Sequence, residues 1–214
     1  MTAPQPGPSP IAIVGLIGGQ WFGRDAEAAL RAADVLLGHG RQFALLDPTI
    51  PGERVELWGN LQVVLDRAVE VRDHGGRPCI LADGDPGLHG IVGFAAAALG
   101  EEALAVHPAP SSIALAFARV GTGWDDAAIV SLRRRTPEEA AAEVLAHDKA
   151  AVLVSPANPP EALGRALVAA GADDRRVAVC SRMGEPEERI VRTDAAGLAA
   201  GPFDPFSVVV VRSA

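Results

Sequence analysis

The sequence predicts an α/β protein in which short buried strands alternate with helices over two successive halves. Short apolar runs end at a glycine, a proline or an acidic residue, which is typical of strands buried in a parallel sheet. Between them, apolar residues recur every three or four positions, the spacing of an amphipathic helix. Two prolines at 107–110 separate the halves, because proline disfavours helix and lacks a backbone donor. We therefore expect two α/β domains.

The first domain is expected at residues 11–108, after a flexible, proline-rich N-terminus at 1–10. The expected strands are 11–15, 34–38, 79–82 and 104–107, and the expected helices are 25–33, 61–71 and 91–99. Because strand and helix alternate in this order, we expect a mainly parallel sheet covered by helices.

The second domain, expected at 109–214, repeats the alternation. Thr136 before Pro137 is a favourable N-cap with proline at the first helical position, so a helix should begin there. The other expected elements are helices at 112–120 and after 159–160, and strands at 128–132, 151–154 and 176–180. Two last strands, 188–192 and 207–212, are expected to run antiparallel at one side of this second sheet.

Composition excludes several classes of protein. The 214 residues are 49% hydrophobic and 21% charged, too apolar for a disordered chain. A net charge of −8 argues against nucleic acid as the main partner, because phosphate binding needs a broad basic surface. Cys79 and Cys180 stand far apart without a CxxC pair, which favours neither a disulfide scaffold nor a zinc site. With no membrane span or signal peptide recognised, we expect a soluble, cytoplasmic protein.

Ligands of open parallel sheets bind at the carboxyl ends of the strands, so the loops after the strands are candidate sites. The loop at 15–19 lacks the G-x-G-x-x-G spacing because Ile17 and Gln20 replace glycines, which argues against NAD. The loop at 83–87 places two carboxylates and two glycines directly after a strand. A carboxylate there could accept hydrogen bonds from ribose hydroxyls. An ordinary Asp-Pro-Gly turn is the alternative.

Two further loops are unusual. Ser111 and Ser112 present two hydroxyls at the start of a helix, where simple N-capping is the alternative. The loop at 155–160 is rich in proline, and capping of the next helix is again the plainer interpretation. No metalloprotease, nucleophile-elbow or Walker motif occurs, so neither a metal site nor a serine hydrolase is expected.

The order of these motifs resembles the tetrapyrrole methylase family, the two-domain S-adenosylmethionine enzymes of cobalamin and sirohaem synthesis. The resemblance rests on the glycine-rich first loop, on Gly84-Asp85-Pro86 and on the linker at 108–112, and it covers residues 11–212. Within the family, four features are similar to the branch that methylates carbon 5 of precorrin-6Y or its cobalt counterpart. They are Trp21 and Gly23, Gly38-x-x-Arg41, the run at 108–121, and Val130-Ser-Leu132.

The resemblance implies two α/β domains of the tetrapyrrole methylase type with the active-site cleft between them. S-adenosyl-L-methionine would lie in this cleft beneath a corrinoid substrate, without a metal. The residues that match the family's cofactor contacts are Gly84, Asp85, Leu88, Ser111, Ser112, Ser155 and Met183. No catalytic residue is assigned, because transfer from a sulfonium methyl needs alignment rather than acid–base help.

The corrinoid implied by the resemblance carries several carboxylates, whereas the chain itself carries −8. Local arginines would then have to hold the substrate. Arg41 and Arg133, each after an expected strand, are the candidates, with the neighbours of Arg133 at 134–135 and a weaker third in Arg24. Gly18 would contact the macrocycle from the first loop.

The sequence also fits two other functions. The same fold could methylate another substrate, of the uroporphyrinogen or diphthine type. The chain could also be a non-catalytic cofactor-binding half of a fused enzyme. We expect a homodimer, and a fusion to or partnership with a second, decarboxylating precorrin methylase is an alternative.

Overall fold

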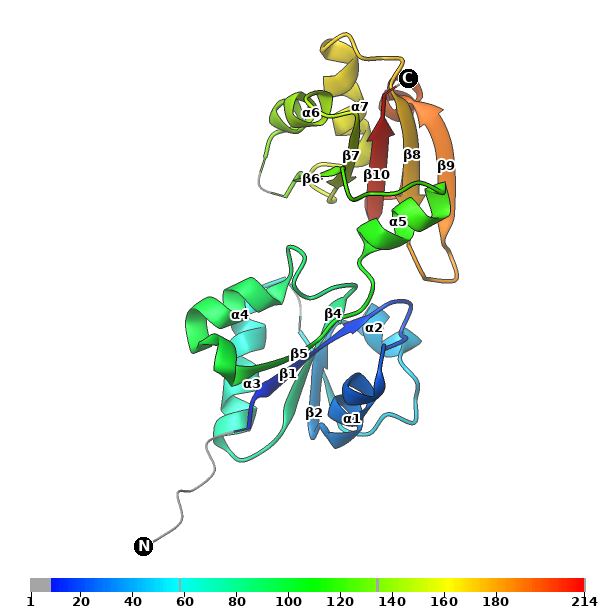
Figure 1. The fold of residues 1–214 in the computed structure, drawn as a ribbon. Coiled ribbons are helices and arrows are strands. Elements are labelled where there is room, and N and C mark those ends of the chain that lie inside the picture. The colour runs from blue at the N-terminus through cyan, green and yellow to red at the C-terminus, as the bar shows by residue number, and fades with distance from the viewer. Residues whose placement is uncertain (1–8, 58, 134, 214) are drawn as a thin grey trace, which may run out of the picture. The chain divides into compact units, whose positions relative to one another are not determined.

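The computed structural model describes residues 9–57, 59–133 and 135–213. The chain divides between Ser111 and Ser112 into two compact units, a few residues beyond the junction expected at 108. Each unit is built on a five-stranded sheet (Figure 1). Among the described helices, none is long and apolar enough to cross a membrane. The expected flexible N-terminus falls mostly on residues 1–8, which lie outside the described residues.

The sheet of the first unit has the strand order β3-β2-β4-β1-β5, and every pair in it is parallel, as the alternation predicts. Its strands are β1 (Ile11–Leu16), β2 (Val35–Gly38), β3 (Glu53–Glu56), β4 (Pro78–Asp83) and β5 (Leu104–His107). Its helices are α1 (Arg24–Ala32), α2 (Gly40–Leu45), α3 (Leu61–Asp73), α4 (Ile91–Leu99) and the 3₁₀ turn η1 (Glu101–Ala103). The sequence patterns missed α2 and β3, because α2 is short and β3 is a largely exposed edge strand.

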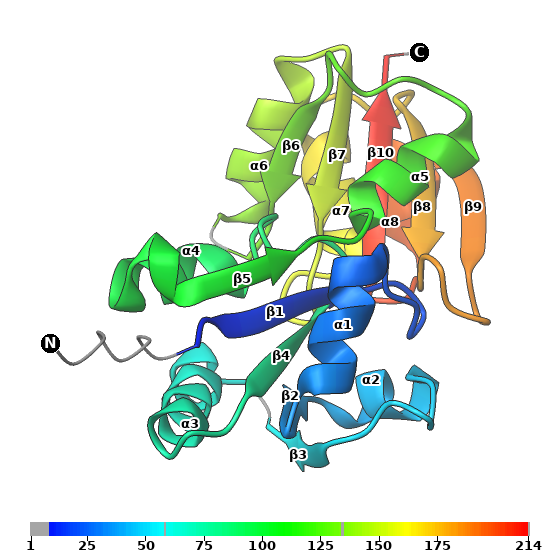
Figure 2. The same ribbon diagram turned by 60° about the horizontal axis from the view of Figure 1, so that its bottom comes forward.

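The two faces of this sheet bury separate apolar clusters. Ile11 and Ile13 of β1 pack with α3 and α4 on one face, whereas Val14 and Leu16 pack with α1 on the other. Figure 2 shows α1 and α3 on opposite sides of the strands. Burial on both faces explains why the strands read as continuous apolar runs.

The sheet of the second unit is mixed, with the order β6-β7-β10-β8-β9. Its strands are β6 (Ala128–Ser131), β7 (Lys149–Leu153), β8 (Arg176–Ser181), β9 (Arg189–Asp194) and β10 (Ser207–Arg212). Its helices are α5 (Ser112–Val120), α6 (Pro137–Leu145), α7 (Pro160–Ala169) and α8 (Ala195–Ala200). Figure 2 shows α5 in front of β10 and α7 with α8 behind the sheet.

The last two strands are antiparallel as predicted, but the prediction that both lie at one side is wrong. β9 is an edge strand, whereas β10 lies between β7 and β8 and runs antiparallel to both. The reason is the apolar run Val208 to Val211, which is buried throughout and therefore needs a neighbouring strand on each side.

Thr136 caps α6 as the sequence predicts. Its side chain accepts the Glu139 N–H, and the Glu139 carboxylate accepts the Thr136 N–H at 2.9 Å. This reciprocal capping box satisfies two donors at the helix start. It fixes the point at which the chain enters α6 after the loop that follows β6.

Candidate functional site

The carboxyl ends of the five parallel strands share one edge of the first sheet, the edge at which open α/β sheets bind ligands. Backbones of three strand-end segments touch there. The Gly84 N–H donates to the Leu16 carbonyl at 2.7 Å. A Cβ on Gly15 would lie 2.2 Å from the Gly84 carbonyl oxygen and 2.7 Å from the Ala109 nitrogen. Gly15 therefore lets the segments after β1, β4 and β5 close on one another.

The predicted cofactor residues Gly84, Asp85 and Leu88 lie in one compact turn after β4. Gly84 has a φ of 68°, in the left-handed region that favours glycine. Asp85 Oδ1 accepts the Gly87 N–H at 2.8 Å, and the Leu88 N–H donates to the Asp85 carbonyl at 3.1 Å. These bonds are those of an Asp-Pro-Gly turn. Asp85 Oδ2 makes no hydrogen bond within the described residues, so this half-buried carboxylate keeps one acceptor for a ligand.

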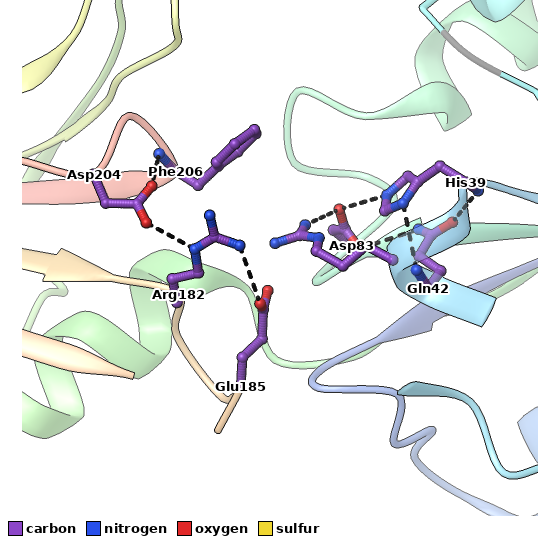
Figure 3. Close-up of polar contacts among 8 residues, drawn as sticks. His39, Gln42, Asp83, Arg182, Glu185, Asp204 and Phe206 are labelled. Atoms are coloured by element: carbon purple, nitrogen blue, oxygen red, sulfur yellow. Dashed lines mark hydrogen bonds and ion pairs between the residues drawn. The ribbon is translucent and has the colours of Figure 1, made fainter. Parts of the chain in front are cut away.

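Asp83, the last residue of β4, binds three side chains from the segment that follows β2 (Figure 3). Its Oδ2 accepts from Arg41 at 2.8 Å and from His39 Nε2 at 3.1 Å, and its Oδ1 accepts from Gln42 at 3.1 Å. Partial burial raises the pKa of Asp83, but the His39 hydrogen bond and the Arg41 charge outweigh it and leave the pKa below its ordinary value. Asp83 is therefore ionised at neutral pH.

His39 is held in one tautomer by this arrangement. Its ring Nδ1 accepts the Gln42 backbone N–H at 3.4 Å, and the His39 backbone N–H donates to Gln42 Oε1 at 3.1 Å. These two bonds form a capping box at the start of α2. The ring proton therefore sits on Nε2, which faces Asp83. Because both ring nitrogens are engaged, His39 has no lone pair left to act as a general base.

Gly18 lies in a two-residue turn directly after β1. Ile17 and Gln20 pair across this turn by reciprocal backbone hydrogen bonds of 2.9 Å. A Cβ on Gly19 would come within 2.0 Å of the Leu45 carbonyl at the end of α2. The glycine-rich sequence thus forms a tight turn packed on α2, which leaves Gly18 at its tip.

In the second unit, the ends of β6, β7 and β8 and the start of β10 share one edge of the sheet. This edge collects the predicted residues Arg133, Ser155 and Met183. Arg133 is exposed, and its side chain makes no hydrogen bond or ion pair within the described part of the chain. Met183 is only 7% exposed. Arg134, the neighbour that was predicted together with Arg133, lies outside the described residues.

The loop after β7 is a closed turn. Ser155 and Asn158 exchange backbone hydrogen bonds of 3.1 and 3.0 Å. The Asn158 amide also donates to the Leu132 carbonyl at 2.9 Å, which ties this loop to the end of β6. Ser155 is therefore held in position, by a partner that the sequence did not single out.

Arg182 fixes the loop after β8 and is a residue that the sequence analysis missed. It has a φ of 52°, unusual for a residue other than glycine. Its side-chain Nε donates to Asp204 at 2.7 Å, and its guanidinium lies 5.2 Å from the Phe206 ring centre (Figure 3). Its backbone N–H donates to the Phe206 carbonyl at 3.1 Å. These contacts join the segment that carries Met183 to the start of β10.

A cavity of about 210 Å³ adjoins this segment in the second unit. Two arginines and two acids line it together with apolar side chains, the charged residues being Arg182, Arg189, Glu187 and Asp204. The two charges of each sign balance one another, so the lining does not by itself select a cation or an anion.

Ser111 and Ser112 stand at the division between the units. Ser111, the last residue of the first unit, is 8% exposed, and Ser112 is the first residue of α5 in the second. Their role in cofactor binding stays a prediction.

Neither cysteine is suited to be a nucleophile. Burial raises the pKa of Cys79 to about 12 and that of Cys180 to about 11, so both remain thiols at neutral pH. Among the described residues, no group of three or more His, Cys, Asp or Glu side chains could hold a metal ion.

Comparison with known proteins identifies the family. The model of the tetrapyrrole (corrin/porphyrin) methylases matches residues 15–199. The chain belongs to this family. This tetrapyrrole methylase carries the motifs at 84–86 and 108–112 inside the matched region, at the carboxyl ends of β4 and β5.

The proteins similar to this methylase include two curated relatives and one solved structure, described below. It is 31% identical over 93% of its length to a Mycobacterium tuberculosis precorrin-6Y C(5,15)-methyltransferase [decarboxylating], of which it spans only 50%. It is also 31% identical over 76% of its length to a Salmonella typhimurium cobalt-precorrin-7 C(5)-methyltransferase, covering 80% of that protein. A Thermus thermophilus uroporphyrin-III C-methyl transferase, crystallised with S-adenosyl homocysteine, matches 95% of this chain and 97% of its own at a TM-score of 0.72 and 19% identity.

Apart from Ser111 and Ser112 at the division between the units, the predicted residues lie at two sheet edges, one in each unit, and the structure adds residues that the sequence did not assign. In the first unit these are His39, Gln42 and Asp83. One signal was present, because Asp83 is a second carboxylate at the start of the 83–87 loop. Two of its partners, His39 and Gln42, gave none, because they lie at the N-cap and inside the short helix α2 that the sequence patterns missed.

Proposed function

We propose that this methylase transfers a methyl group from S-adenosyl-L-methionine to carbon 5 of a precorrin-type corrinoid in cobalamin biosynthesis. This proposal rests mainly on the two curated relatives described above. The chain matches half of an enzyme named for carbons 5 and 15, and four-fifths of an enzyme named for carbon 5 alone. The shared segment therefore corresponds best to the carbon-5 activity.

The proposed cofactor site begins at the turn after β4. When bound, S-adenosylmethionine supplies an electrophilic methyl group on a sulfonium. The turn suits such a ligand because glycine permits close backbone approach and Asp85 Oδ2 is available to a ribose hydroxyl. Ser111, Ser112, Ser155 and Met183 are proposed to complete the site.

We assign no general base to the reaction. His39 has both ring nitrogens engaged, and Asp83 receives three donors. The protein's contribution is to hold nucleophile and methyl group in line, and such positioning can lower a barrier by about 7–11 kcal/mol. The electron-rich macrocycle itself provides the nucleophilic carbon.

The first test measures ligand binding and product mass. We expect S-adenosylhomocysteine to bind with micromolar affinity by calorimetry and NAD to show no heat of binding. Incubation with a precorrin substrate and S-adenosylmethionine should add one methyl group without loss of carbon dioxide, with uroporphyrinogen III as the control substrate. Binding without any methylated product would favour a non-catalytic cofactor-binding half, and a methylated uroporphyrinogen would favour the other substrate class.

The proposed substrate contacts are Gly18, Arg41 and Arg133. Arg133 is the most direct candidate for a corrinoid carboxylate, because it is exposed and unpaired within the described residues. Arg41 already donates to Asp83, so part of its charge is compensated. We therefore propose Arg133 as the stronger of the two substrate contacts.

We expect Arg133→Ala to raise the corrinoid KM about 10- to 150-fold, the equivalent of one charged hydrogen bond of about 1.5–3 kcal/mol. The KM for S-adenosylmethionine should stay unchanged, and added salt should narrow the difference between the variant and the wild type. Arg135→Ala is the matched control, because Arg135 already pairs with Glu143 at 3.5 Å. Equal effects of the two substitutions on the corrinoid KM would show that Arg133 has no special role.

Two broader expectations also remain proposals. We propose that the protein is cytoplasmic and forms a homodimer. Analytical ultracentrifugation of the purified chain would test the dimer. A fusion or partnership with a decarboxylating methylase is consistent with the length of the Mycobacterium tuberculosis relative, of which this chain spans half.

A further inference from the structure

Strands β2 and β4 are clamped to each other at both of their ends. At the amino end, Arg77 directly before β4 donates to Asp34 directly before β2, at 2.9 and 3.1 Å from its side chain and 2.8 Å from its backbone. At the carboxyl end, Asp83 of β4 binds His39, Arg41 and Gln42. Only the carboxyl-end clamp adjoins the turn at 84–88.

We propose that Asp83 is the positioning residue of the cofactor turn, and that His39, Arg41 and Gln42 hold it in the orientation that the turn requires. This inference rests on the proposed function, because it assumes that the turn binds S-adenosylmethionine. It assigns Asp83 a role through its neighbours in the chain, without contact with the ligand.

The directions of the hydrogen bonds support this role. Gln42 is 5% exposed, and its side-chain Oε1 accepts the backbone N–H of His39. Its side-chain NH₂ must therefore point at Asp83 Oδ1. His39 and Arg41 converge on the other oxygen, Oδ2. Each carboxylate oxygen therefore has its own donors, and the plane of the carboxylate is fixed.

The position of Asp83 in the chain transmits this constraint. The next residue, Gly84, takes the left-handed φ of 68°, and its N–H donates to the Leu16 carbonyl. Asp85, one residue further, presents the oxygen proposed to meet the ligand. A change in the orientation of Asp83 would move this peptide and the Asp85 carboxylate with it.

The test is a double-mutant cycle between Asp83 and Gln42, with S-adenosylhomocysteine affinity as the readout. Asp83→Asn turns one acceptor into a donor that faces the Gln42 NH₂, and Gln42→Glu places a second carboxylate against Asp83. We expect each single variant to bind at least about ten-fold more weakly. The double variant restores one donor and one acceptor, with one negative charge, and should recover to within about three-fold of the wild type.

Asp34→Asn is the matched control, because it weakens the clamp at the other end of the same two strands. It should lower Tm while S-adenosylhomocysteine affinity stays within about two-fold of the wild type. If the double variant is as weak as the two single losses combined, or if Asp34→Asn weakens binding as much as Asp83→Asn does, the positioning role is wrong. If the wild type itself fails to bind S-adenosylhomocysteine, the proposed function fails instead.

Discussion

Gly84→Val is expected to abolish S-adenosylhomocysteine binding, with a loss of more than about 100-fold, while the protein stays folded. Gly84 is buried and adopts a φ of 68°, which a β-branched residue reaches only with strain of about 1–3 kcal/mol. The valine side chain would also stand where the backbone is proposed to approach the cofactor. Calorimetry for affinity and a thermal melt for folding together measure the effect.

Gly75→Val separates the local strain from the loss of the site. Gly75 has a φ of 81° and open space around its Cβ position, and it follows α3, before the amino end of β4. Both variants should therefore lose stability through the strain of a left-handed φ, but only Gly84→Val should lose the ligand. A folded Gly84→Val protein that binds as tightly as Gly75→Val would contradict the proposed role of the turn.

Much of the fold was predictable because its signals are local. Buried strands such as β1 and β4 are continuous apolar runs, and glycine or proline ends them within the chain itself. Since carboxyl ends of parallel strands meet at one edge, a correct order of strands and helices already groups Gly84 with the loop after β1. The residues at 84–88 could be placed at a sheet edge without any knowledge of packing.

The remainder depends on contacts that no local pattern encodes. The insertion of β10 between β7 and β8 is decided by which strands need two neighbours, a property of the whole sheet. His39 and Asp83 are 44 residues apart, and their pairing follows from the adjacency of β2 and β4. The left-handed backbone of Arg182 is imposed by Asp204 and Phe206, so its own residue type gave no warning of it.

Gly15→Ala tests whether the closure of three strand-end segments creates the cofactor site. One methyl group at residue 15 would overlap the Gly84 carbonyl oxygen at 2.2 Å and the Ala109 nitrogen at 2.7 Å. Both obstacles are backbone atoms, so neither can rotate away, and the segments after β4 and β5 must separate from β1. We expect a stability loss of about 3 kcal/mol and at least a ten-fold loss of S-adenosylhomocysteine affinity.

The control for this prediction is Gly52→Ala. Gly52 lies just before β3, at the amino ends of the strands of the same sheet, and a Cβ on it would lie 2.9 Å from the Ala33 carbonyl oxygen. Its positive φ of 100° adds strain, so Gly52→Ala should also lose stability, by about 1–3 kcal/mol. Because that strain lies at the amino ends of the strands, S-adenosylhomocysteine should bind its folded form with wild-type affinity. Equal affinity losses in the two variants would mean that binding follows the stability of the first unit as a whole. A loss confined to Gly15→Ala would locate binding where the segments after β1, β4 and β5 meet, because only there does the added methyl group force the backbones apart.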